Sequence, residues 1–125
     1  MGVFRVKARI WNPLDPSKSR NRELLVDTSA TYTVIPHDIL EALNIKILKY
    51  ARFRLADNRV IEKPVGEVGI EVEGYRASAT PVVFGDPDIY ILGSVTMEQL
   101  GLTPDPITRK LKPAEALLMK TKLSL

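Results

Sequence analysis

Apolar and charged side chains alternate along residues 3–11, and this pattern limits the local structure more than any other feature of the sequence. One side of the pattern carries Phe4, Val6, Ala8 and Ile10, and the other carries Arg5, Lys7 and Arg9. A period of two indicates a strand with one buried face. Six further short stretches, rich in apolar and β-branched residues, are also typical of strands: residues 23–26, 31–35, 45–55, 60–72, 75–84 and 89–92. The sequence therefore predicts an all-β fold.

One or two short helices interrupt the strands. The first is expected to begin near Pro36, which suits a first helical turn, and to end at Asn44. The second is expected to begin with Ser94 as N-cap and to end at Gly101. The apolar stretches between Leu111 and the C-terminus predict a terminal strand.

The composition narrows the class of protein. The chain has 125 residues and no cysteine, which predicts one domain, residues 1–125, with a core that needs no disulfide. No run approaches the ~18 apolar residues of a membrane span, and the N-terminus lacks a signal peptide's apolar segment. We therefore expect a cytoplasmic protein with no membrane partner. The net charge is only +3, and the densest basic cluster, residues 18–22, is expected to be a solvated loop. Without a basic face, nucleic acid is not an expected partner.

Two separate segments carry the residues that suggest chemistry. In the first, the apolar residues 24–26 run directly into Asp27, which the small residues Thr28, Ser29 and Ala30 follow. A carboxylate at the end of an apolar strand is costly unless it is hydrogen-bonded or used. The second segment, residues 89–94, is an apolar strand that ends in a glycine and leads into the second predicted helix. Taken alone, an aspartate at this position is more often a turn or cap residue after a strand, so the first segment by itself assigns no catalytic role to Asp27.

Together these segments resemble the retropepsin family, the half-size aspartic proteases of retroviruses and their cellular relatives. The first resembles the family's hydrophobic–hydrophobic–Asp–Thr/Ser–Gly–Ala motif, and the second resembles its apolar–apolar–Gly segment with the C-terminal helix. Residues 70–77 resemble the strand–turn–strand that follows the flap. The resemblance covers residues 23–102 and leaves residues 103–125 as a C-terminal extension. It implies a closed acid-protease barrel that works as a homodimer.

The resemblance also implies an activity, the hydrolysis of peptide bonds by an aspartic endopeptidase. Each subunit of such a dimer supplies one aspartate, here Asp27, to a shared pair that activates a water molecule. Thr28 matches the residue whose hydroxyl braces the active-site loop across the dimer, and Ser29 and Ala30 complete that loop. The implied substrate is a peptide or an unfolded protein, and no metal or organic cofactor is implied. The N-terminal strand and the segment after Lys112 are the expected dimer contacts.

Substrate pockets and a flap follow from the same resemblance. Four positions match residues that line family pockets: Ala30, Val34, Ile89 and Ile91. All four are apolar, which predicts a preference for apolar side chains beside the scissile bond. The flap tip is expected at Ala56, Asp57, Asn58 and Arg59, where Asp and Asn tolerate a turn. Family flaps close over the peptide and exclude water.

Ser29 departs from the family pattern, because the family usually has glycine at this position. Glycine tolerates backbone conformations that serine does not. The alternative function is therefore a weakly active or inactive homodimer that binds peptides with the same fold. Two further alternatives carry less weight. His37 is the only histidine and has no partners at the spacing of a catalytic triad, and Asp86 and Asp88 lie in a turn sequence rather than in a pattern typical of a cation site.

Overall fold

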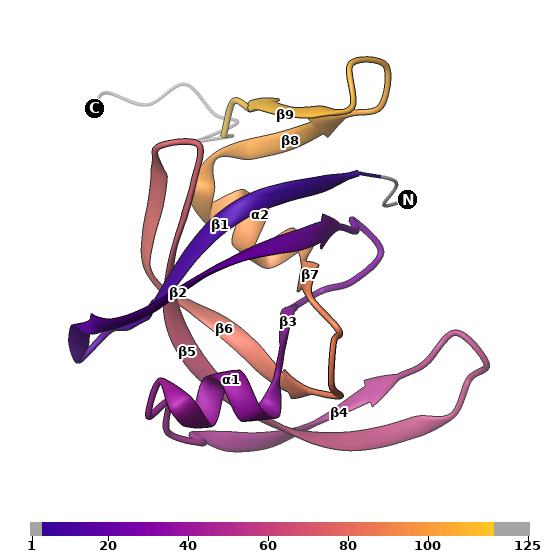
Figure 1. Cartoon of the computed structure of the whole chain (residues 1–125). Helices are drawn as coiled ribbons and strands as arrows, with labels where there is room; N and C mark the ends of the chain where they lie inside the picture. The colour runs from indigo at the N-terminus through magenta and orange to yellow at the C-terminus, as the bar shows by residue number, and fades with distance from the viewer. Residues whose placement is uncertain (1–3, 117–125) are drawn as a thin grey trace, which may run out of the picture.

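The computed structural model describes residues 4–116, most of which lie in short strands (Figure 1). The strands are β1 (Arg5–Asn12), β2 (Asp15–Val26), β3 (Thr33–Pro36), β4 (Lys49–Arg54), β5 (Val60–Val72), β6 (Tyr75–Gly85), β7 (Ile91–Leu92), β8 (Leu102–Asp105) and β9 (Lys110–Pro113). The helices are α1 (His37–Ala42) and α2 (Ser94–Leu100). The predicted β-rich fold with two short helices is confirmed.

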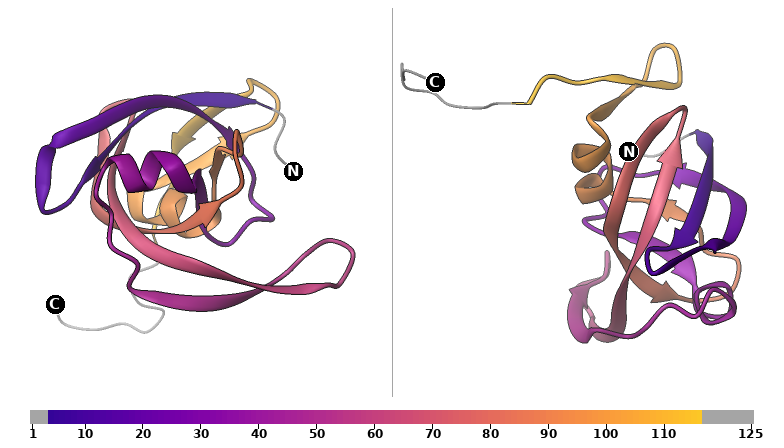
Figure 2. Two further views of the ribbon diagram at one scale, coloured as in Figure 1. Left: turned by 60° about the horizontal axis from the view of Figure 1, so that its bottom comes forward. Right: turned by 90° about the vertical axis from the view of Figure 1, so that its left-hand side faces the viewer.

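Six strands form a closed ring in the order β1, β2, β7, β3, β6 and β5, because β5 pairs back onto β1. Strand β4 pairs only with β5 and lies outside the ring. The β4–β5 hairpin extends well beyond the body of the molecule (Figure 2). Strands β8 and β9 form a second sheet of their own. Two hairpins therefore project from one closed sheet.

The inside of the ring is filled by one apolar cluster. Each of the six ring strands contributes a fully buried side chain: Ile10, Leu24, Ile35, Ile70, Val82 and Leu92. Buried residues of both helices join the same cluster. The alternation predicted for the first strand is confirmed, since its apolar side faces this core and its charged side faces solvent.

The ring closes where Trp11 of β1 lies opposite Gly69 of β5. A Cβ atom on Gly69 would lie 2.1 Å from Cε2 of Trp11, so only glycine leaves room for the indole ring. The guanidinium carbons of Arg9 and Arg76 lie 5.1 and 4.8 Å from the ring centroid. Trp11 is consequently buried beneath two cations on the outer surface of the sheet.

The beginnings of several strands differ from the prediction, including β3 at Thr33 and β7 at Ile91, and those of β2 and β4 differ most. Strand β2 begins at Asp15, so residues 18–22 belong to a strand, and the prediction of a solvated loop was wrong. These residues pair with β1, for example Arg20 with Ile10. Backbone pairing does not require apolar side chains, so the hydrophobic pattern of the sequence did not indicate this part of the strand. Strand β4 begins at Lys49 rather than at residue 45.

The helix ends follow the predicted signals with one exception. Asn44 after α1 has φ 60°, and Gly101 after α2 has φ 72°, as expected of residues that terminate helices. Gly93, not Ser94, occupies the N-cap of α2, and Ser94 is the first helical residue. Of the predicted terminal strand, Lys110–Pro113 is formed as β9, and residues 117–125 lie outside the described residues. Neither helix in the described part is long and apolar enough to cross a membrane.

Candidate active site

Asp27 follows the last residue of β2, where this strand runs parallel to β7. Leu25 donates a backbone hydrogen bond to the carbonyl of Tyr90 at 2.9 Å, and Asp27 donates one to the carbonyl of Leu92 at 3.1 Å. The β2–β7 ladder therefore fixes the backbone of Asp27, although its side chain is only half-buried.

A tight turn after β2 directs the carboxylate of Asp27 toward its own loop. Oδ1 of Asp27 accepts hydrogen bonds from the backbone N–H of Ser29 at 3.0 Å and from the Ser29 hydroxyl at 2.5 Å. Ala30 donates its N–H to the Asp27 carbonyl at 3.2 Å. Thr28 and Ser29 are exposed at the end of this turn. A serine at this position thus gives the carboxylate a donor that glycine lacks.

The start of α2 holds the other side of the loop. Ser94 and Val95 donate backbone hydrogen bonds to the carbonyls of Ala30 at 2.8 Å and Thr31 at 3.0 Å. Gly93 lies so close to the loop that a Cβ atom there would be 2.5 Å from the carbonyl carbon of Tyr32. The two segments that suggested chemistry are therefore in direct contact, although about sixty residues separate them.

Three buried threonine hydroxyls connect the strands beneath the loop, and the sequence did not single them out. The Oγ1 atom of Thr96 in α2 lies 2.6 Å from Oγ1 of Thr33 and 2.7 Å from Oγ1 of Thr80. Thr33 also accepts the N–H of Gly93 at 3.1 Å. All three threonines are fully buried. In the sequence they look like ordinary β-branched strand and helix residues, so no signal distinguished them.

A cleft of about 620 Å³ lies between the Asp27 loop and the β4–β5 hairpin. The loop side of its lining includes Ser29, Ala30, Val34 and Ile89, and the hairpin side includes Phe53, Leu55 and Ile61. Tyr32 and Phe53 meet edge to face, with ring centroids 5.8 Å apart. Of the four predicted pocket positions, Ala30, Val34 and Ile89 lie in this lining, and Ile91, which pairs with Leu25 and Val34 in the sheet, does not. The cleft is largely apolar, and a Lys63–Asp86 ion pair of 3.0 Å lies in its wall.

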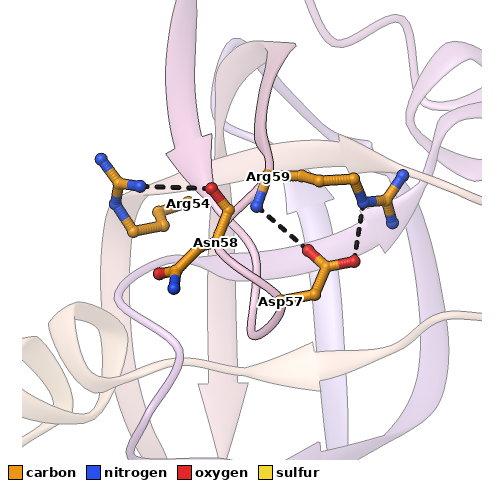
Figure 3. Close-up of polar contacts among 4 residues, drawn as sticks. All are labelled: Arg54, Asp57, Asn58 and Arg59. Atoms are coloured by element: carbon orange, nitrogen blue, oxygen red, sulfur yellow. Dashed lines mark hydrogen bonds and ion pairs between the residues drawn. The ribbon is translucent and has the colours of Figure 1, made fainter.

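The end of the β4–β5 hairpin is the turn that the sequence predicted as the flap tip (Figure 3). Arg59 donates its backbone N–H to Oδ1 of Asp57 at 3.1 Å and its Nε–H to Oδ2 at 2.7 Å. Arg54 donates to the carbonyl of Asn58 at 3.2 Å. Asn58 has φ 69°, a conformation that asparagine tolerates and that glycine more often supplies. Side-chain hydrogen bonds thus define this tip in place of glycines.

The hydrogen bonds from Arg59 favour the ionised form of Asp57. The pKa of Asp57 is lowered from 3.8, first by the backbone N–H of Arg59 and then by its guanidinium group. The ionised group therefore stabilises the tip at pH values above 3.8, and this contribution is lost as the pH falls through the lowered pKa. We expect Arg59→Ala to raise the pKa of Asp57 part of the way toward 3.8, because the backbone donor remains. Carbon-13 NMR titration of the carboxyl group measures this change.

The matched control is Arg54→Ala, since Arg54 binds the Asn58 carbonyl rather than the Asp57 carboxylate. It removes the same kind of side chain from the same tip. Asp57 should titrate in this variant as in the wild type. Identical titration curves for Arg59→Ala and the wild type would contradict the ion pair.

The remaining candidates of the sequence lie apart from the cleft or form other contacts. His37 is exposed, lies 3.8 Å from Glu41 in the next turn of α1, and packs against Phe84. Asp86 forms the ion pair with Lys63, and Asp88 has φ 66° in the same turn. Residues 4–116 contain no group of three or more histidine, cysteine or acidic side chains arranged to hold a metal ion.

Comparison with known families gives one match. The model of a family described as gag-polyprotein putative aspartyl protease matches residues 18–110. The match covers well over half of the chain and extends beyond residues 23–102 at both ends. A search among curated proteins found no match.

Proposed function

The chain belongs to the retroviral-type aspartyl protease family, and on that premise we propose that it is an aspartic endopeptidase that works as a homodimer. Family membership supports protease function in general. The finer assignment, with Asp27 as the catalytic residue, depends on the geometry of this chain.

The position of the Asp27 loop at the edge of the apolar cleft carries the proposal. Ser29 and Ala30 line the cleft directly after Asp27, and the β4–β5 hairpin forms the opposite wall. An extended peptide in this cleft would pass the Asp27 carboxylate. The hairpin would cover it and exclude water from the reacting bond.

A second copy of the chain completes the reaction. One chain supplies one such aspartate, and a two-fold axis beside the loop would bring two copies of Asp27 together. Two carboxylates at close range share a proton, so that one can act as general base and the other as general acid. The base takes a proton from the water that attacks the peptide carbonyl. The acid hydrogen-bonds the carbonyl oxygen and later protonates the leaving nitrogen.

The lining of the cleft supports a substrate class. Ala30, Val34 and Ile89 present apolar surface beside the loop, and Phe53 and Ile61 do so from the hairpin. Apolar substrate side chains gain most from this surface. An extended segment fits between loop and hairpin, so we propose peptides and unfolded proteins as substrates. Ile91 was predicted as a fourth pocket residue, and it lies outside the lining of this cleft in the single chain.

Ser29 favours a second candidate function, a dimeric module that binds peptides without cutting them. Its hydroxyl donates to Oδ1 of Asp27 at 2.5 Å. This hydroxyl occupies one acceptor position of Oδ1, which a glycine at position 29 would leave open to substrate. We rank this candidate second, because the same hydrogen bond also holds the carboxylate in a defined orientation, which catalysis requires.

The test combines cleavage and self-association. Wild-type protein is incubated with an unfolded protein and with a peptide library from about pH 3 to pH 8, a range that spans the acidic optimum of shared-proton pairs. Sedimentation in the same buffers reports the dimer. Cleavage beside apolar residues is the expected result. A folded dimer that binds peptides without cleaving them at any pH would instead support the second candidate.

A further inference from the structure

The β1–β2 hairpin holds more positive charge than the rest of the chain balances. Six basic and two acidic residues lie between Arg5 and Val26, whereas the formal net charge of the whole chain is only +3. In β2, the basic residues Lys18, Arg20 and Arg22 occupy alternate positions. Alternate residues of a strand lie on one face, about 7 Å apart. The strand therefore arranges these three cations in a regular row.

The edge of β2 beside this row is open. Among the described residues, β7 pairs only with the last two residues of β2, and β1 lies on the other side. Leu25 donates its N–H toward β7, and Val26 donates its N–H toward β1. Because this direction alternates along an antiparallel strand, the backbone groups of Ser19 and Asn21 point to the open edge. Such unpaired backbone groups are a template for an incoming extended chain.

Two arginines change what this edge can bind. Arg20 donates from Nη1 to the carbonyl of Ser19 at 2.9 Å, and Arg22 donates from Nη1 to the carbonyl of Asn21 at 2.8 Å. Arg22 also donates its Nε–H to the hydroxyl of Tyr90 at 3.1 Å, which fixes its guanidinium group further. With both carbonyls covered, the edge presents backbone and guanidinium N–H groups, all of them donors. A ligand with anionic acceptors fits this edge better than a neutral strand does.

The adjoining surface has the same sign of charge. A shallow concavity of about 430 Å³ lies beside Arg22, with Lys7 and Arg9 in its lining. Glu23 is the one acidic residue of that lining, and it lies opposite Lys7 in the β1–β2 ladder. None of these residues lines the cleft near Asp27. In Figure 1 and in the left view of Figure 2, the turn of this hairpin lies on the side away from the β4–β5 tip.

We propose that the open edge of β2 binds an extended acidic peptide segment of a partner protein, with Arg20 and Arg22 binding its carboxylates. Side chains at every second position of an extended peptide have the same spacing as the two arginines. A guanidinium group has five N–H donors, so each arginine keeps donors for a carboxylate after its bond to the edge. The backbone N–H groups of the edge would bind carbonyls of the peptide. This inference does not depend on the proposed protease function.

The hairpin lacks what a single-stranded nucleic acid would need in addition to charge. Bases bind protein surfaces largely by stacking on aromatic side chains. Between Arg5 and Val26 the one aromatic residue is Trp11, which is 4% exposed beneath Arg9 and Arg76. The structure therefore favours a peptide, and an oligonucleotide is the competing ligand in the test.

The test measures the affinity of labelled peptides for the protein by fluorescence anisotropy. One peptide of about ten residues alternates Glu and Ser, and a second has the same composition with its glutamates in one block. We expect the alternating peptide to bind more tightly, because its side-chain spacing matches the strand. Arg20→Gln and Arg22→Gln should each weaken its binding about fivefold, and the double variant about 20-fold.

The matched control is Arg5→Gln, which removes the same charge from an exposed position on the same hairpin. Arg5 pairs with Leu25, three residues along the ladder from Arg22. That offset is about 10 Å, more than the Debye length of about 8 Å at 0.15 M salt. Binding by Arg5→Gln should therefore stay within about twofold of the wild type.

Each outcome supports or overturns the proposal. Weaker binding by Arg20→Gln and Arg22→Gln alone, with unchanged circular dichroism, supports it. Equal losses in these variants and in Arg5→Gln would mean that only net charge matters, and would overturn it. A block peptide that binds as tightly as the alternating one overturns the extended binding mode. Tighter binding of a single-stranded oligonucleotide, or no binding of either peptide, overturns the assignment of the partner. Cleavage enters none of these measurements, so the protease proposal is tested separately.

Discussion

Asp27→Asn is expected to lower the rate of peptide cleavage by at least about 10²–10⁴-fold, the usual contribution of general acid–base catalysis. The substitution removes the acid–base group from both subunits of the proposed dimer at once. Asparagine has the same shape, and its side-chain oxygen can still accept the two hydrogen bonds from Ser29. The loop should therefore keep its conformation while the chemistry is lost. The measurement is kcat/KM for a peptide that the wild type cleaves, with dimer state checked in parallel.

Asp88→Asn is the matched control for this substitution. Asp88 is exposed in the turn before β7, lies outside the cleft lining, and has φ 66°, which asparagine adopts readily. Activity within about twofold of the wild type is expected, as for surface substitutions generally. Cleavage by Asp27→Asn at the wild-type rate would remove Asp27 from the mechanism, whatever the fate of the control.

The sequence predicted the central hairpins well because their turns are marked locally. Strand β5 spans Val60–Val72 as predicted, between the turn at Asp57 and Asn58 and the turn at Gly74. Gly74 has φ 84°. Glycine, asparagine and aspartate tolerate this left-handed backbone and so favour turns that end a strand. Local signals of this kind need no knowledge of the rest of the fold.

Features that depend on contacts distant in sequence could not be read in the same way. The polar part of β2 is a strand only because β1 supplies its backbone partners. The hydroxyl cluster around Thr96 joins residues from β3, β6 and α2, and nothing near any one of them indicates the others. Ser94 carries an N-cap side chain, yet Gly93 occupies the N-cap and Ser94 is the first helical residue, since the Asp27 loop accepts the first N–H groups of α2.

The candidate site depends both on local sequence signals and on contacts between residues distant in sequence. The identity of Asp27 could be inferred from its own segment and from the order of the second segment. Their mutual contact depends on the sheet, which places Gly93 of one segment against Tyr32 of the other. A glycine was predicted there as part of a motif, and the structure supplies the physical reason for it. That reason leads to the second large expected effect.

Gly93→Ala is expected to destabilise the protein by about 3–5 kcal/mol, at the upper end of single substitutions. The new Cβ would lie 2.5 Å from the carbonyl carbon of Tyr32 and 2.8 Å from the backbone nitrogen of Thr33. A flexible side chain in contact with the new methyl group could rotate away from it. These contacts, however, are backbone atoms at the end of the loop that carries Asp27, and they cannot. Separating the segments would also lengthen the hydrogen bonds of Gly93 to Thr33 and of Ser94 to Ala30. Urea denaturation measures the free energy of unfolding.

Gly74→Ala separates steric contact from backbone strain. Gly74 has φ 84°, and a Cβ atom added there would have no atom within 4 Å beyond its own residue and its two chain neighbours, so alanine meets strain but no steric contact. Its expected cost is about 1–2 kcal/mol, that of a left-handed conformation in a residue with a Cβ. If Gly93→Ala costs no more than Gly74→Ala, the contact between the two segments is looser than the geometry implies. A larger cost for Gly93→Ala, together with loss of cleavage in any folded fraction, would show that the close contact of Gly93 with Tyr32 stabilises the fold and also orients Asp27.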